Sequence, residues 1–410
     1  MTVTSADRAA TERLVHHRVL VIGGGNAGLS VAGRLRRMGV ADIAVIEPRE
    51  KHLYKPLFSH IAGGRARGSE AVRDQGAVTP KGVKWIKDAV ATIEPESSSV
   101  RLASGGEVTY DHLIVCPGIQ KNWDGIPGLE AAMASPYGAS NYEFDLAVKA
   151  STLLRNLRRG TAVFSQPRGP ASCAGAGQKP MYLACDYWRA IGVLPDIRVI
   201  LVVPDDTVFG IPEIDRELNR KIDEYGIELR TRSEILDVDA ENRIVRIGRT
   251  DAQPDSISYD ALLVEPPQSA PDWLKSSGLA AAGDDGGFVE VDPEMLRHPR
   301  FANVWALGDA AATRNSKSGG ALRKQTFVVA KNLGDVLQGR IPSTKYDGYA
   351  VCPFTVSRST VVFAEFDDHY ALKPTIPFWK GLGHERRLTW VFDRHILPWV
   401  YWNMILKGLA

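Results

Sequence analysis

The strongest constraint on the fold is a glycine-rich turn between two apolar segments near the N-terminus. The run from Arg18 to Ile22 is mostly apolar and β-branched, which is typical of a buried parallel strand. Glycines follow at positions 23, 25 and 28, a helical periodicity extends to Gly39, and a second apolar run, Ile43–Ile46, ends at Glu47. This order of strand, G-x-G-x-x-G turn, helix, strand and acid predicts a dinucleotide-binding unit.

Each residue of the turn has a physical role in such a unit. Gly23 permits the tight turn, Gly25 lets the backbone approach a pyrophosphate, and Gly28 lets helix and strand pack closely. The helix start supplies free N–H groups for phosphates, and Glu47 can accept hydrogen bonds from a ribose. The motif does not distinguish FAD from NAD. The cofactor-binding candidates of this unit are Gly23, Gly25, Asn26, Ala27, Gly28, Glu47 and Pro48.

The chain also contains an internal repeat. The segment T-Y-D-H-L-I-V-C-P at 109–117 resembles S-Y-D-A-L-L-V-E-P at 258–266, and a β-like segment precedes each copy, at 84–102 and 228–247. Two tandem dinucleotide-type units of an α/β fold are the simplest account.

The glycine turn is missing from the second copy. Its first strand, Thr161–Phe164, leads to Gln166 where Gly23 stands in the first copy, and Pro167 and Pro170 enter the turn. Proline removes N–H donors that a phosphate needs. We therefore expect the second unit to keep its fold and to lose its nucleotide.

Two further positions bear on this loss. Val203 replaces the ribose-binding acid, although Asp205, two residues later, leaves weak NAD binding open. Cys173 stands in the altered turn, at a position expected to face the first cofactor. A cysteine in such a loop is a candidate reactive thiol.

The composition of the chain limits the classes of protein to which it can belong. A chain of 410 residues exceeds one compact core, and 44% hydrophobic with 24% charged residues is ordinary for a soluble protein. The net charge of +2 implies no polyanion, so we expect no nucleic-acid partner. The cysteines Cys116, Cys173, Cys185 and Cys352 have neither C-x-x-C nor zinc spacing, so we expect no metal site. Residues 1–17 lack an apolar core, which argues against secretion.

Several segments are shared with a known family: V-L-V-I-G-G-G at 19–25, H-L-Y-K-P at 52–56, C-A-G-A-G-Q-K-P-M-Y-L at 173–183, N-V-W-A-L-G-D at 303–309, K-Y-D-G-Y at 345–349 with C-P at 352–353, A-E-F-D at 364–367 and Y-W-N-M at 401–404. On these segments the chain resembles the pyridine nucleotide–disulfide oxidoreductase superfamily, and within it the mitochondrial-like sulfide:quinone oxidoreductases. The likeness runs from about Arg18 to Lys407.

The resemblance implies two Rossmann-like units, FAD in the first of them, and a C-terminal interface region. It implies an FAD-binding part at 17–150, a degenerate unit with Cys173 at 151–263, a second FAD-binding part at 264–342, and a quinone and membrane region with Cys352 at 343–410. Asp309 matches a residue that accepts hydrogen bonds from the ribityl chain, and Lys317 matches a lysine near the flavin or the quinone. The other implied cofactor contacts are Tyr54, Pro56, Pro117, Gly118 and Gly308.

The resemblance also implies that Cys173 and Cys352 form a sulfide-oxidising couple. Hydrosulfide attacks the sulfur-bridged pair, Cys352 takes the sulfane sulfur as a persulfide, and Cys173 leaves as a thiolate. The electrons pass through FAD to quinone, and a small thiol or another nucleophile removes the sulfur. The leaving role requires a low pKa at Cys173, which Lys179 and a helix expected from Ala174 would favour. The resting bridge, disulfide or trisulfide, is left open.

The C-terminal region combines aromatic and basic residues. A helix of this composition lies in a membrane interface rather than across it, and a quinone is lipid-soluble. We therefore expect a peripheral protein on the cytoplasmic-type face of an energy-transducing membrane; a docking helix and a homo-oligomer contact are left open. The residues concerned include Phe378, Trp379, Trp390, Phe392, Trp399, Tyr401 and Trp402, with Lys380, Arg386, Arg387, Arg394 and Lys407 between them.

Three other functions remain to be weighed. A type II NADH:quinone oxidoreductase would need an intact second glycine turn and no cysteine couple. A sulfide dehydrogenase with a cytochrome acceptor would usually be exported. A non-catalytic flavin-binding sulfur carrier would hold FAD without turnover.

Overall fold

The computed structural model describes residues 15–249, 252–284, 286–375 and 383–410. Most of the N-terminal stretch on which secretion was judged lies outside this range, and so do Phe378, Trp379 and Lys380 of the aromatic C-terminal region.

The first glycine turn belongs to a seven-stranded sheet. Its order is β5-β2-β1-β8-β7-β6, with β19 paired to the C-terminal half of β8, whose N-terminal half pairs with β7. The strands β1, β2, β5, β8 and β19 run parallel, whereas β6 and β7 form an antiparallel extension. The bounds are β1 Val15–Ile22, β2 Ile43–Ile46, β5 Lys84–Ile86, β6 Val90–Glu94, β7 Ser99–Leu102, β8 Glu107–Val115 and β19 Val304–Ala306.

The second unit repeats this arrangement. Its five parallel strands have the order β10-β17-β11-β12-β13, so β13-β12-β11-β17 match β5-β2-β1-β8 in sequence and in space. A three-stranded antiparallel sheet, β14-β15-β16, lies between β13 and β17 in the chain. The expected pair of dinucleotide-type units in an α/β fold is therefore confirmed. The bounds are β10 Gly138–Ala139, β11 Gly160–Ser165, β12 Ile197–Val202, β13 Glu228–Arg230, β14 Ser233–Asp239, β15 Ile244–Arg249, β16 Ala252–Ser258 and β17 Ala261–Val264.

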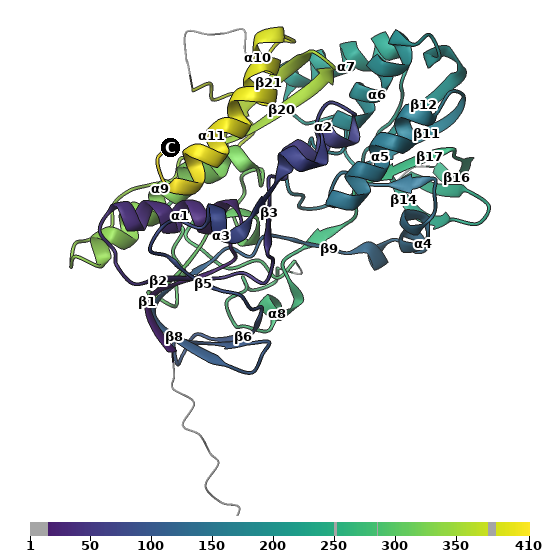
Figure 1. The fold of residues 1–410 in the computed structure, drawn as a ribbon. Coiled ribbons are helices and arrows are strands. Elements are labelled where there is room, and N and C mark those ends of the chain that lie inside the picture. The colour runs from purple at the N-terminus through teal and green to yellow at the C-terminus, as the bar shows by residue number, and fades with distance from the viewer. Residues whose placement is uncertain (1–14, 250–251, 285, 376–382) are drawn as a thin grey trace, which may run out of the picture.

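Helices cover both sheets (Figure 1). Helix α1 follows the first glycine turn and packs against α9, while α2, α5 and α6 contact one another beside the second unit. The bounds are α1 Asn26–Arg37, α2 Leu57–Ala62, α3 Gln75–Val78, α4 Leu129–Ala134, α5 Phe144–Asn156, α6 Lys179–Ala190, α7 Pro212–Tyr225, α8 Asp272–Lys275 and α9 Gly319–Val336; the short strands are β3 Lys51–Leu53, β4 Val72–Asp74, β9 Gln120–Lys121 and β18 Gln268–Ser269.

The C-terminal region is a hairpin followed by helices. The strands β20, Ala350–Ser357, and β21, Thr360–Phe366, precede α10, Arg387–Val391, a π-helical turn, Phe392–Ile396, and α11, Leu397–Asn403. The chain then returns to α1, where a Cβ at Gly33 would lie 2.8 Å from the Lys407 carbonyl carbon. Figure 1 shows these last helices, in yellow, lying above α1 and beside the hairpin. Within the described ranges, every helix is too short or too polar to cross a bilayer.

One local expectation needs correction, and one stays a prediction. The helix expected from Ala174 begins at Lys179, because residues 174–178 form turns that hold the preceding cysteine loop. Cys352 lies inside the buried strand β20. The domain boundaries near residues 150, 263 and 342 remain a prediction.

Candidate active site

The first glycine turn has the close packing that the motif predicts. Gly23 has a φ of +100°, and a Cβ there would lie 2.4 Å from the carbonyl oxygen of Cys116. A Cβ at Gly28 would lie 1.8 Å from the carbonyl oxygen of Gly23, so strand and helix touch through backbone. Gly25, in contrast, faces open space. The turn therefore presents bare backbone at the N-terminal end of α1, as a phosphate site requires.

A cavity of about 990 Å³ opens beside this turn, at the upper end of the roughly 300–1,000 Å³ usual for ligand sites. It extends from the glycine turn past Cys173 to the C-terminal helices. Most of the predicted cofactor contacts line it: Gly23, Gly25, Asn26, Ala27, Glu47, Pro48, Tyr54, Pro56, Pro117, Gly118, Gly308 and Asp309. Gly28, Lys317 and Cys352 are outside this lining.

Two lysines bear on the cation expected near the cofactor. The Lys317 ammonium donates to the carbonyl of Ala311 at 2.7 Å and lies 4.2 Å from the Phe288 ring centroid. Burial lowers the pKa of Lys317 to about 8. Lys55, which the sequence did not single out, lines the cavity, and desolvation by the surrounding protein lowers its pKa. Lys55 is thus a cation facing the cavity.

The structure brings Cys173 and Cys352 together. Their Sγ atoms are 3.5 Å apart, although the residues are 179 positions apart in sequence. This separation is longer than the S–S bond of about 2.05 Å and shorter than two such bonds end to end. A direct bond after side-chain rotation and a bridge of one sulfur atom are both within reach. Gly175 permits the approach, because a Cβ there would lie 2.8 Å from the Cys352 Sγ.

The backbone of Cys173 is held in an unusual conformation. Its φ is +58°, a left-handed value that non-glycine residues rarely adopt and that costs about 1–3 kcal/mol. The Cys173 N–H donates to the carbonyl of Lys317 at 2.7 Å, and the Tyr142 hydroxyl donates to the Cys173 carbonyl at 3.3 Å. These two bonds aim the thiol at its partner in strand β20.

The electrostatics separate the two thiols. A hydrogen bond from Cys352, and then the charge of Lys179, lower the pKa of Cys173 to about 6 against the effect of burial. The Lys179 Nζ is 3.7 Å from the Cys173 Sγ. Burial raises the pKa of Cys352 well above its ordinary value, because its side chain is enclosed by β20 and the cysteine loop. Cys173 is therefore the thiolate of the pair near neutral pH.

A buried acid lies behind the cysteine loop. Glu265 follows β17, is 2% exposed, and accepts a hydrogen bond from Gln268 Nε2 at 3.0 Å. Gln268 Oε1 in turn accepts from the Ser172 N–H at 3.0 Å. Burial raises the pKa of Glu265 well above its ordinary range, which favours the protonated form of this acid. The internal repeat could have pointed to Glu265 as a residue of this site, since Glu265 occupies the position that Cys116 has in the first copy.

The other two cysteines are enclosed. Cys116 follows β8 and Cys185 lies in α6, and both are buried. Burial raises the pKa of each thiol well above its ordinary value. Neither thiol is therefore primed for attack.

The turn of the second unit is closed by its own side chains. Gln178 Nε2 donates to Gln166 Oε1 at 2.7 Å, and Gln166 Nε2 donates to the carbonyl of Ala174. These bonds tie together the loop that would have to present free N–H groups to a phosphate. This contact is consistent with the expected loss of a second nucleotide, which stays a prediction.

The far end of the cavity is aromatic and apolar. His52 Nε2 and the Tyr401 hydroxyl are 2.6 Å apart, and the rings of Tyr54 and Tyr401 are 4.2 Å apart. Burial lowers the pKa of His52 to about 4, so this imidazole is neutral. Phe392, Ile396, Leu397 and Val400 from the C-terminal helices complete the wall.

Comparisons with known proteins agree with this geometry. The family model of pyridine nucleotide-disulphide oxidoreductases matches residues 17–332. The mitochondrial sulfide:quinone oxidoreductase of Mus musculus is 35% identical over 396 residues, which cover 96% of this chain and 87% of that protein. The corresponding protein of Dictyostelium discoideum is 30% identical over 394 residues, with 95% and 86% covered. The crystal structure of the sulfide:quinone oxidoreductase from Aquifex aeolicus shares the fold, with a TM-score of 0.82 at 18% identity over 97% of this chain and 92% of that chain.

The fold and the cavity thus define a flavin-type pyridine nucleotide-disulphide oxidoreductase. Within that class, the chain belongs to the sulfide:quinone oxidoreductase family. Members of this family are FAD-dependent flavoproteins, and FAD is the cofactor of this chain. The bare glycine turn and the adjoining cavity fit such a ligand.

Proposed function

We propose that this protein oxidises sulfide at the Cys173–Cys352 pair and delivers two electrons to a quinone. The observation that carries this function is the pairing itself. Two sulfur atoms 3.5 Å apart, one beside a lysine, meet next to the cavity that begins at the dinucleotide turn. Bound FAD would supply the two-electron relay between the cysteine pair and the quinone.

The two cysteines have different parts in the sulfur chemistry. With the pair bridged by a disulfide, hydrosulfide forms a new S–S bond to Cys352 while the Cys173–Cys352 bond breaks. Sulfide sulfur becomes sulfane sulfur in a Cys352 persulfide, and the bonding electron pair leaves on Cys173 as a thiolate. A small thiol then removes the outer sulfur from Cys352. Reoxidation of the two cysteines, with loss of two electrons, restores the bridge.

Lys179 and the cysteine loop support the leaving role of Cys173. The ammonium 3.7 Å from the Cys173 Sγ stabilises the thiolate as it is released. The hydrogen bonds to the backbone on both sides of Cys173 keep its sulfur directed at Cys352 during the exchange. Glu265 holds a proton beside the site because its carboxyl group is buried.

We assign the predicted cofactor contacts that line the cavity to FAD. We assign the aromatic end of the cavity to the quinone. Gly23, Gly25, Asn26 and Ala27 would hold the phosphates, and Glu47 would hold the ribose. Phe392, Ile396 and Val400 provide an apolar wall suited to a hydrophobic ring and tail. His52 and Tyr401, 2.6 Å apart, offer a hydrogen-bonded pair at this end.

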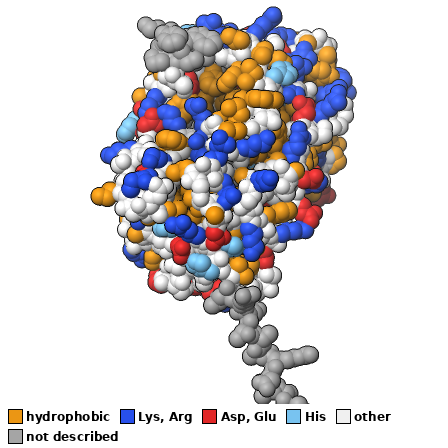
Figure 2. Space-filling view, turned by 60° about the vertical axis from the view of Figure 1, so that its left-hand side comes forward, with side chains coloured by type: hydrophobic (Ala, Val, Ile, Leu, Met, Phe, Trp, Pro, Cys, Tyr) orange, Lys and Arg blue, Asp and Glu red, His pale blue; other side chains and the backbone are white. Residues whose placement is uncertain are grey.

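We further propose peripheral attachment to a membrane through the C-terminal helices. Leu388 and Trp399 are 60% and 59% exposed, and Val391, Phe392 and Ile396 are exposed beside them. Figure 2 shows hydrophobic side chains gathered on the upper part of one face, with Lys and Arg side chains along its border. An apolar face with a basic rim is typical of a helix that lies in the bilayer interface. A lipid-soluble quinone would enter from that side.

The decisive test uses the purified holoprotein under anaerobic conditions. Sodium sulfide should bleach the flavin absorption, and a short-chain quinone should restore it. Cys173→Ser should abolish bleaching, whereas Cys185→Ala, a change at a buried cysteine on the adjacent helix, should leave it intact. Bleaching by NADH without bleaching by sulfide would instead favour an NADH:quinone oxidoreductase.

A further inference from the structure

A second, smaller pocket lies apart from the cysteine pair and the main cavity. It has a volume of about 180 Å³ and lies among the ends of α2, α5 and α6 and the turn between β20 and β21. Three arginines, one tyrosine and two glycines dominate its wall: Arg65, Arg155, Arg358, Tyr187, Gly63 and Gly64.

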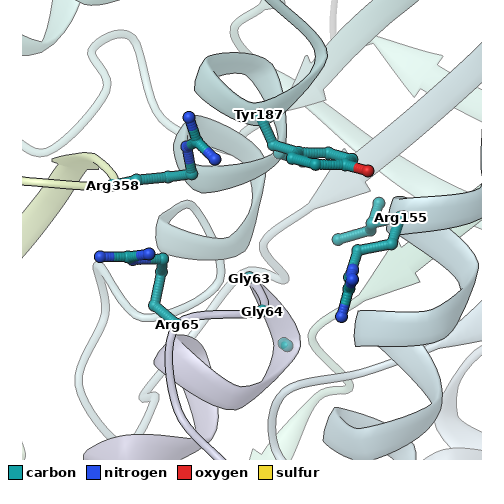
Figure 3. Close-up of a pocket in the computed structure, with 9 residues that line it drawn as sticks. Gly63, Gly64, Arg65, Arg155, Tyr187 and Arg358 are labelled. Atoms are coloured by element: carbon teal, nitrogen blue, oxygen red, sulfur yellow. The ribbon is translucent and has the colours of Figure 1, made fainter. Parts of the chain in front are cut away.

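The arginines surround the pocket from opposite sides. Figure 3 shows the guanidinium groups of Arg65 and Arg358 on one side and Arg155 with the Tyr187 ring on the other. Gly64 carries no side chain, and a Cβ there would lie 3.4 Å from the Cδ of Arg155. A ligand in this space would therefore meet N–H donors from more than one direction.

The positive charge of the pocket is only partly balanced. Arg358 is paired with Asp186 at 3.3 Å, but Asp186 also binds Arg189 at 2.7 Å. Among the described residues, Arg65 and Arg155 have no carboxylate partner. The Arg65 Nε is shielded from solvent without a hydrogen-bond partner in the same residues. Burial, and then the charges of Arg358 and Arg394, lower the pKa of Arg65.

Helix capping does not account for these side chains. Cations at helix C-terminal ends are common because they bind the last carbonyl groups. Here the carbonyl of His60 accepts from the backbone N–H groups of Arg65 and Ala66, and that of Ile61 accepts from Gly64. The Arg65 guanidinium instead stacks on Trp390, with its carbon 5.5 Å from the ring centroid. In the described part of the chain, these helix-end carbonyls are therefore taken by backbone donors and not by the Arg65 guanidinium, which lies over Trp390 beside the pocket.

We propose that this pocket binds a phosphate group. The guanidinium fork matches phosphate oxygens with paired hydrogen bonds. A tetrahedral anion presents oxygens on all sides, which suits donors that face each other across a small space, whereas a planar carboxylate would engage one fork. The site is independent of sulfide oxidation.

The phosphate group can come from free phosphate or from a lipid headgroup. The position of the pocket wall suggests a lipid headgroup. Trp390, on which Arg65 stacks, lies in α10 between the exposed apolar residues Leu388 and Val391. A pocket at the edge of an apolar helix face can reach the headgroup layer of a bilayer.

Two measurements on the FAD-loaded protein test the proposal. Calorimetry with inorganic phosphate tests free phosphate, and co-sedimentation tests the headgroup, using phosphatidylcholine vesicles with and without phosphatidic acid. We expect Arg155→Gln to weaken at least one of these responses about tenfold, since one charge-assisted hydrogen bond is lost. Arg155 is exposed, so this change leaves the fold intact.

Arg101→Gln provides the matched control, because Arg101 is an exposed arginine on β7. Loss of phosphate binding in Arg155→Gln alone assigns the site to free phosphate. If Arg155→Gln loses only the extra vesicle binding that phosphatidic acid causes, the pocket binds a lipid headgroup. If wild-type protein shows neither response, or if both variants lose it equally, the proposal is wrong. Sulfide-dependent bleaching of the flavin, measured in parallel, reports separately on the proposed function.

Discussion

Replacing Lys179 with glutamine should raise the pKa of the Cys173 thiol. The Lys179 Nζ lies 3.7 Å from the Cys173 Sγ. Two unit charges at that distance attract by about 1.1 kcal/mol in water and about 4.5 kcal/mol at an effective dielectric constant of about 20. One pKa unit corresponds to about 1.36 kcal/mol, so the lost attraction is worth about 0.8 to 3.3 units. From its value of about 6, the pKa should therefore rise to between about 7 and 9.

The rate of alkylation at Cys173 measures this change. The thiolate is the reactive form, so the rate in reduced wild-type protein should rise as the pH increases through about 6. For a shift of about 2 units, Lys179→Gln should react about tenfold more slowly at pH 7. Iodoacetamide labelling followed by mass spectrometry of the Cys173 peptide gives the rate at each pH.

Lys81→Gln is the control, because Lys81 is an exposed lysine in a turn. It removes the same charge without touching the cysteine site. The alkylation rate of Cys173 should therefore depend on pH in this variant as it does in the wild type. An unchanged profile in Lys179→Gln would show that the ammonium does not stabilise the thiolate and would refute the electrostatic argument.

Four other changes have defined outcomes. Cys352→Ala should retain FAD, seen by absorbance, but should no longer be bleached by sulfide. Gly23→Ala should lose FAD and unfold at a lower temperature, because its Cβ would lie 2.4 Å from a backbone oxygen at a φ of +100°; strain of this kind costs about 1–3 kcal/mol. Glu265→Gln should leave the pKa of Cys173 within about half a unit, because burial raises the pKa of Glu265 and so favours its protonated form; a clear fall would mean that Glu265 is ionised. Trp399→Ser should weaken vesicle binding about tenfold in a sedimentation assay, since burial of one large apolar side chain is worth about 1.5–3 kcal/mol.

The local parts of the molecule were predictable from sequence. The strand Val15–Ile22, the helix from Asn26 and the strand Ile43–Ile46 lie where the first motif places them. The repeat predicted a second unit, and the matching strand order bears this out. Such elements depend on neighbouring residues, since backbone freedom and apolar periodicity act over a few turns or a few strand positions.

Other features required the tertiary structure. The contacts of the Lys317 ammonium with Phe288 and Ala311, and the place of Lys55 in the cavity lining, could not be read from sequence spacing, and the role of Lys317 near the flavin or the quinone stays a prediction. The helix after Cys173 starts five residues later than expected, because turns hold the cysteine loop. A side chain's direction depends on every element packed around it, and sequence spacing does not encode that packing.

The sequence by itself therefore determined the dinucleotide-type units and the loss of the second glycine turn. Only the tertiary structure decided how Cys173 and Cys352 meet, which of them has the low pKa, and that Lys179 and Glu265 surround them. The reason is physical. A glycine turn is specified by the residues within it, whereas a contact across 179 positions, and the charges and burial that tune it, exist only once distant elements have packed together.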